Sequence, residues 1–102
     1  MSSFRIHHLH AFTVGDDDDN VDSVVELQDG RSFAVTFFTL KNIESLMKRW
    51  QSSGEAAGGS YFWAVDAIIL RSLSHSEMER AIADMLKMGF LEKALTPVAE
   101  DE

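Results

Sequence analysis

The amino-acid sequence predicts a single α+β domain of two layers, with a mixed four-stranded sheet and two helices on one of its faces. Three observations lead to this fold class. Two alternating apolar stretches flank Asp29-Gly30, two other stretches carry apolar residues at helical spacing, and one long apolar run covers residues 60–71. A chain of 102 residues, 45% of them hydrophobic, is long enough for one core. We expect the domain to span residues 1–98 and the acidic residues 99–102 to form a disordered tail.

The first part of the chain predicts three strands, over residues 3–14, 21–27 and 32–38, with a loop at 15–20. The second and third form a hairpin. A two-residue loop would pair apolar with polar side chains, whereas a three-residue loop with a left-handed Gly30 pairs apolar side chains with one another. We predict this second register, which sets Val25 opposite Phe33, Ser23 opposite Val35 and Val21 opposite Phe37.

The next stretch predicts a helix over residues 40–51, with Thr39 as its N-cap. Its apolar residues recur at helical spacing and form one stripe: Leu40, Ile43, Leu46, Met47 and Trp50. Residues 52–59, SSGEAAGG, predict the end of the helix and a flexible connection.

The apolar run over residues 60–71 predicts the fourth strand, because it is rich in aromatic and β-branched residues. It pairs in parallel with the third strand if the helix between them is a crossover connection. Asp66 then lies among Phe62, Ile68 and Leu70 and needs a hydrogen-bond or charge partner. Two interpretations stay open: Asp66 ties down a loop or helix end, or it is an acid, base or ligand-binding group.

The end of the chain predicts a closing helix. Ser74 followed by Glu77 matches the capping-box pattern, and Gly89 is a typical left-handed stop. The inward-facing residues at helical spacing are Met78, Ala81, Ile82, Met85 and Leu86. The complete order is strand, strand, strand, helix, strand, helix.

Composition limits the classes of function. The absence of cysteine excludes disulfides and thiolate metal sites, and the net charge of −8 argues against nucleic acid as a partner. The first ten residues lack the apolar core of a signal peptide, and no uncharged apolar run is long enough to cross a membrane. We therefore expect a cytoplasmic protein without a bound cofactor.

Negative charge is concentrated in two places, the run of Asp16, Asp17, Asp18 and Asp19 and the acidic end at residues 100–102. The rest of the chain has ten acids and nine bases, so it is close to neutral. The aspartate run lacks the glycine and the closing glutamate of a calcium loop. It is a solvated turn or a surface that attracts a basic protein.

His7, His8 and His10 raise the hypothesis of a zinc site on the first strand, with His75 or one of the aspartates as a further ligand. The spacing does not fix where such ligands lie, and polar residues on a half-exposed edge strand explain the pattern better. We therefore predict no metal ligand and no catalytic residue.

Four aromatic residues, Trp50, Tyr61, Phe62 and Trp63, flank the glycine-rich connection. We expect Trp50 and Phe62 to pack in the core. Tyr61 and Trp63 either pack there too or form an aromatic anchor for a partner protein. On an uncovered sheet face they would also favour self-association, such as a homodimer.

Two segments, GRSFAVTFFTLKNIESLMKRW and YFWAVDAIIL, resemble small bacterial domains of the toxin-immunity-protein type. The resemblance implies a cytosolic inhibitor that binds a toxin domain through a charged or aromatic surface, and it assigns no residue a role. The leading hypothesis is a non-enzymatic protein-binding module, in its most specific form an immunity-type inhibitor of a basic toxin domain. The alternatives are a small-molecule or metal-binding enzyme that uses Asp66 with His7, His8 and His10, and a homo-oligomeric scaffold protein.

Overall fold

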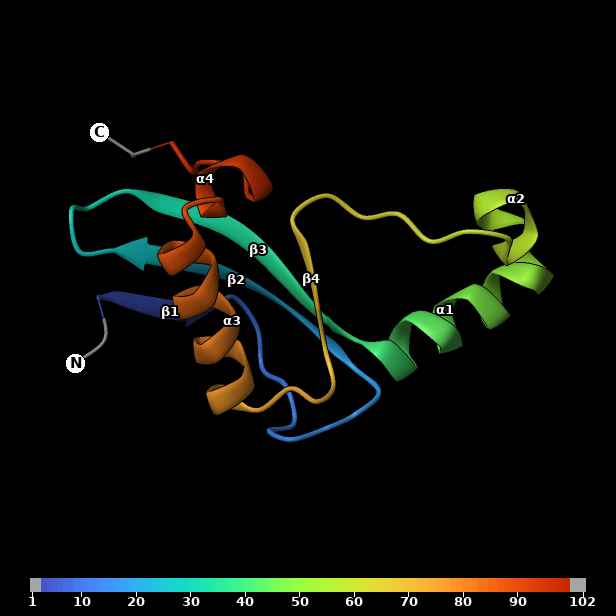
Figure 1. Cartoon of the computed structure of the whole chain (residues 1–102). Coiled ribbons are helices and arrows are strands. Elements are labelled where there is room, and N and C mark those ends of the chain that lie inside the picture. Colours follow the sequence, from blue (N-terminus) through green and yellow to red (C-terminus); the bar gives the residue numbers. More distant parts are fainter. Residues whose placement is uncertain (1–2, 100–102) are drawn as a thin grey trace.

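The computed structural model describes residues 3–99. Its elements, in chain order, are β1 (Phe4–His8), β2 (Asn20–Leu27), β3 (Ser32–Thr39), α1 (Leu40–Ser53), α2 (Glu55–Gly59), β4 (Ala67–Leu70), α3 (His75–Met88) and α4 (Leu91–Ala94) (Figure 1). The sheet has the order β1-β2-β3-β4, with β1, β2 and β3 antiparallel and β4 parallel to β3. The predicted α+β class and mixed four-stranded sheet are thus confirmed. Apart from Ala99, the tail predicted at 99–102 lies outside the described residues.

The β2–β3 hairpin has the predicted register. Val25 lies opposite Phe33, and Val21 lies opposite Phe37. Gly30 has a φ of 92°, which is the left-handed conformation that the three-residue loop requires. This register sets one apolar face of the hairpin toward the core, whereas a shift of one residue would turn that face to solvent.

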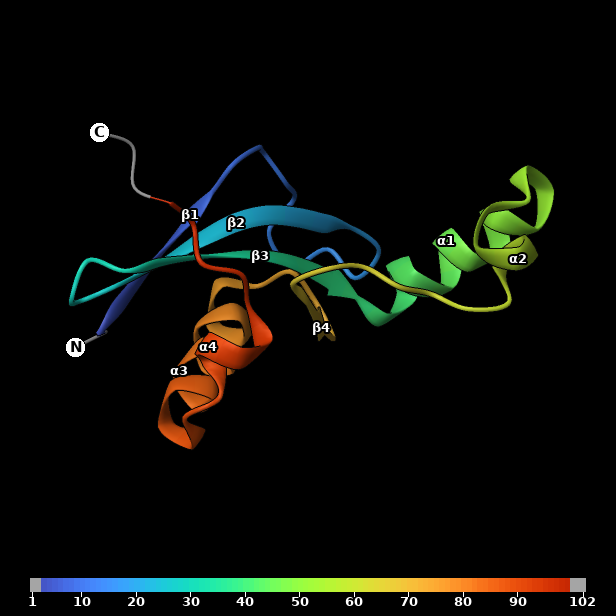
Figure 2. The same cartoon turned by 90° about the horizontal axis from the view of Figure 1, so that it is seen from above.

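The core lies between one face of the sheet and α3 with α4, as Figure 2 shows. Met78 and Ile82 of α3 are fully buried against the sheet, where Phe37 is fully buried as well. Ser74 caps α3 as predicted, since its hydroxyl accepts a hydrogen bond of 3.2 Å from the Glu77 amide. Gly89 ends this helix with a φ of 78°.

Two strands are shorter than predicted. β1 ends at His8, because the chain then turns toward the start of α3 and exchanges two backbone hydrogen bonds of 2.8 Å, from Gly15 to Leu73 and from Leu73 to Asp16. β4 begins only at Ala67, because Asp66 has a φ of 58° and interrupts the extended chain before it.

The helix α1 does not lie on the sheet beside α3. It projects beyond the end of the sheet together with α2 (Figures 1 and 2), and none of its residues, all within the described part of the chain, is buried. The radius of gyration is 14.5 Å, whereas a compact domain of this length has about 13 Å. The reason is the direct passage from Thr39 at the end of β3 into Leu40 at the start of α1, which leaves no loop to fold the helix back. We call residues 40–65 the arm.

A segment near the end of the chain adds to the sheet in a way that the sequence did not predict. The Ala34 amide donates to the Thr96 carbonyl at 2.8 Å, and the Val98 amide donates to the Ser32 carbonyl at 2.9 Å. The outer edge of β3 is therefore shared between this segment and β4. Within residues 3–99, no helix is long and apolar enough to cross a membrane.

Candidate functional site: an aromatic surface and a histidine pocket

The arm presents Tyr61 and Trp63 to solvent. Residues 60–65 run back from the tip of the arm without regular secondary structure, and alternate side chains are exposed: Tyr61 by 55%, Trp63 by 74% and Val65 by 60%. We call these three residues the aromatic surface. The sequence left open whether Tyr61 and Trp63 pack in the core or lie on the surface, and their exposure places them on the surface.

Phe62 fixes this segment to the rest of the molecule. Its ring stacks on Trp50 with centroids 5.7 Å apart and planes 6° apart, and it meets Phe38 edge-on at 5.0 Å. Trp50 and Phe62 thus pack with each other and with Phe38 near the end of β3, outside the core cluster in which we expected them, and both are only partly buried. These ring contacts hold the aromatic surface in place, because Phe62 lies between Tyr61 and Trp63 in the sequence.

The tip of the arm is a tight left-handed turn. Ala56, Ala57 and Gly58 in α2 all have positive φ. Gly59 packs so closely against α1 that an added Cβ would lie 2.0 Å from the Met47 carbonyl oxygen. The segment predicted as a flexible connection is therefore a defined reversal of the chain, in which only glycine fits at position 59.

The aspartate run lies at the base of the arm and contacts the first turns of α1. Asp18 accepts hydrogen bonds from the Ser45 hydroxyl at 3.0 Å and from the Asn42 side chain at 3.3 Å. Asp17 forms an ion pair with Lys41 at 3.6 Å. α1 has no acidic residue in its own first turn, so these carboxylates supply the negative charge that the helix N-terminus favours.

The other two aspartates stabilise the loop itself. Asp16 accepts from the Asp18 amide at 2.9 Å, and Asp19 accepts from the Asn20 amide at 2.8 Å. The expected solvated turn is thus tied to α1, and its charge has a fixed position.

Asp66 is in the turn before β4 instead of in the middle of a strand. Its Oδ1 accepts two hydrogen bonds of 2.8 Å, from the Thr96 amide and from the Thr96 hydroxyl. Its own carbonyl accepts from the Thr36 amide at 2.9 Å. This geometry is that of a residue which ties down a chain segment, the first of the two interpretations drawn from the sequence.

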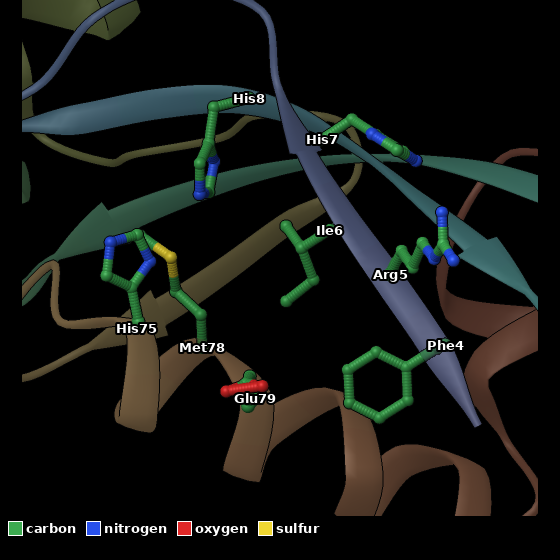
Figure 3. A pocket seen from close by; sticks show the side chains of 8 residues that line it. All are labelled: Phe4, Arg5, Ile6, His7, His8, His75, Met78 and Glu79. Atoms are coloured by element: carbon green, nitrogen blue, oxygen red, sulfur yellow. The ribbon is translucent and has the colours of Figure 1, made fainter. Parts of the chain in front are cut away.

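A pocket of about 580 Å³ lies between β1 and α3. Figure 3 shows His8 from β1 and His75 from α3 at one end of it, with Met78 beside His75. The two imidazole rings have centroids 5.8 Å apart, and Phe12 meets both edge-on. Burial and the neighbouring histidines, His75 first, lower the pKa of His8 below its usual 6.5. At neutral pH, His8 is therefore an uncharged donor or acceptor.

The predicted histidine cluster is divided by the fold. His8 shares a hydrogen bond of 2.7 Å with the buried Ser23, whereas His7 interacts with Glu26 at 3.0 Å. His10 lies beyond the end of β1 and accepts from the Asp22 amide at 3.1 Å. Within residues 3–99, no group of three or more histidines and carboxylates is placed to hold a metal ion.

Asp66 does not lie in the pocket with the histidines. Among the described residues that line it are His7, His8 and His75, but not Asp66, which is bound to Thr96. His75, one of the further ligands that the sequence suggested for the first-strand histidines, does lie beside His8. The edge-on contact of Phe12 with both imidazole rings was not predicted, because the sequence placed Phe12 within the first strand, whereas it follows the end of β1.

Comparisons of the chain with protein-family models, with curated proteins and with solved structures find no match.

Proposed function

We propose that the chain is a non-enzymatic protein-binding module that contacts its partner through the aromatic surface. The observation that carries the proposal is the 74% exposure of Trp63 on a segment that its neighbour Phe62 anchors. Tryptophan and tyrosine are the residues that most often dominate the energy of protein interfaces. An anchored segment also loses little conformational freedom on binding, which favours affinity.

The charge distribution supports a basic protein as the partner. Outside the arm, the described residues include twelve acids and six bases, whereas the arm has two acids and three bases. A negative body accelerates the approach of a positive partner through electrostatic steering. In its most specific form, the proposal is a cytoplasmic immunity-type inhibitor that binds a basic toxin domain, with Asp16, Asp17, Asp18 and Asp19 contributing to the attraction.

The test begins with crosslinking of the tagged chain in its native host, followed by binding measurements on the purified partner. Trp63→Ala should weaken the complex by at least about 2 kcal/mol, which is roughly 30-fold in Kd. Leu9→Ala is the matched control, because Leu9 is similarly exposed but lies off the arm. The association rate should fall as salt is raised. A partner that binds the Trp63→Ala and Tyr61→Ala variants as tightly as the unchanged chain would refute the proposal.

A small-molecule site is the second candidate function, and the pocket with His8 and His75 favours it. Pockets of about 300–1,000 Å³ hold small ligands. This version of the enzyme or metal-site hypothesis uses the histidine pocket without Asp66. Addition of Zn²⁺ to the protein should shift the NMR signals of both rings if the pair binds metal. Unchanged signals of His8 and His75 in the presence of Zn²⁺ would exclude metal binding by this pair.

A further inference from the structure

The two edges of the sheet differ in how they are protected against pairing with another strand. The β1 edge carries Arg5, and a charged side chain on an edge strand discourages such pairing. β4, at the other edge, has the sequence AIIL, without a charge, a proline or a bulge. It is short, but it lacks the other features that protein edges use to prevent association.

The outward side of β4 has backbone groups that can form hydrogen bonds. The Thr36 amide donates to the Asp66 carbonyl, and Thr36 lies beside Ala67 in the register. Because backbone groups alternate along a parallel strand, the N–H and C=O groups of Ala67 and Ile69 point away from β3. Within residues 3–99, neither residue has another hydrogen-bond partner, and the Ile69 side chain is 52% exposed.

The edge is complementary to a second copy of itself in antiparallel orientation. Ala67 and Ile69 share one face of the sheet and Ile68 and Leu70 share the other, so antiparallel pairing can match apolar side chains on both faces. The flanking charges favour the same orientation. Asp66 precedes the strand and Arg71 follows it, so each acid of one copy lies near the base of the other. A parallel arrangement would instead bring like charges together.

We propose that β4 pairs with β4 of a second copy across a twofold axis, which joins the two four-stranded sheets into one of eight strands. The contact is isologous, and it uses a part of the molecule other than the aromatic surface. It therefore goes beyond the proposed function and stands or falls separately. The dimer buries Ile69 of each copy and satisfies the outward backbone groups of Ala67 and Ile69.

The test is light scattering combined with size-exclusion chromatography over concentrations on the order of 1–100 µM, where weak to moderate dimers dissociate. The unchanged chain should have twice the mass of one copy at the upper end. Ile69→Lys should shift the midpoint of dissociation at least tenfold toward higher concentration, because it places like charges at the contact. Met88→Lys is the matched control, since Met88 is also exposed but lies on α3. Circular dichroism verifies that each variant is folded.

Two outcomes would overturn the proposal. One is a chain that has the mass of a single copy at every concentration. The other is an Ile69→Lys variant that dimerises as tightly as the unchanged chain. Loss of the dimer in Trp63→Ala, with Ile69→Lys unaffected, would assign self-association to the aromatic surface instead. Because the binding test above measures a different partner at that surface, either proposal can fail without the other.

Discussion

Replacement of Asp66 should reveal whether this residue serves the fold. Its Oδ1 accepts two hydrogen bonds from Thr96, and each contributes about 1 kcal/mol net because the site is partly exposed to solvent. Alanine at a φ of 58° adds about 1 kcal/mol, since left-handed backbone is less costly for Asp than for Ala. Asp66→Ala should therefore lower the free energy of unfolding by about 3 kcal/mol. For about 100 residues, this corresponds to a fall in Tm of roughly 12–24 °C.

Two companion variants separate these contributions. Asp66→Asn keeps an acceptor oxygen and a side chain that tolerates left-handed backbone, so it should lose less than about 1 kcal/mol. Asp66→Gly removes the hydrogen bonds but also the strain, so it should lose about 2 kcal/mol. Asp84→Ala, which removes an exposed carboxylate from α3, is the control and should change stability by less than about 0.5 kcal/mol.

The assay is urea and thermal unfolding followed by circular dichroism. A double-mutant cycle with Thr96→Val isolates the bond to the hydroxyl and should give a coupling of about 1 kcal/mol. If Asp66→Ala is as stable as the unchanged chain, or if Asp66→Asn is as damaging as Asp66→Ala, the structural role is refuted. Asp66 would then have to be considered again as a functional acid.

Three further predictions concern the pocket and the arm. The pKa of His8 is lower in the folded chain than its usual 6.5, so the unfolded chain binds more protons just below that pH. The free energy of unfolding should therefore be highest above pH 6.5 and fall as the pH decreases, and His8→Gln should reduce this dependence. A free energy of unfolding that does not change with pH in this range would refute the prediction. Gly59→Ala should accelerate hydrogen exchange in α1 far more than Gly58→Ala, because both have positive φ but, among the described residues, an added Cβ meets the Met47 carbonyl only at position 59; equal effects would contradict the close contact. Phe62→Ala should cost about 2 kcal/mol of arm stability and change Trp50 fluorescence, whereas Tyr61→Ala should leave the environment of Trp50 unaltered; an unchanged Trp50 signal in Phe62→Ala would disprove the stack.

The parts of the fold that depend on neighbouring residues could be predicted from the sequence. The hairpin register followed from Asp29-Gly30 and from the need to match Val25 with Phe33, since both constraints act within a dozen residues. The caps at Thr39 and Ser74 are local for the same reason. The apolar stripe of α1 was recognised too, but periodicity shows which side of a helix is apolar and not what covers it.

The candidate sites depended on contacts between distant residues, and these the sequence could not supply. Nothing in the run of aspartates indicates that Asp18 accepts a hydrogen bond from Ser45, which lies 27 positions away. The pairing of Asp66 with Thr96 joins residues 30 positions apart, and it accompanies a positive φ that the sequence pattern did not predict. His8 and His75 were each noted, yet only the packing of α3 on β1 brings their rings together.

The sharing of the β3 edge has a consequence for the synthesis of the protein. Thr96 and Val98 close the half of that edge next to Ser32 and Ala34, so β3 is only partly paired until the ribosome has released residues 96–98. Leu91 and Leu95, which also fill the core, emerge just before them. Until these residues emerge, the nascent chain exposes an incomplete sheet, and an unpaired edge of this kind is prone to aggregate. The sheet is therefore complete only after residues 96–98 have left the ribosome, and until then part of the β3 edge can pair with other strands.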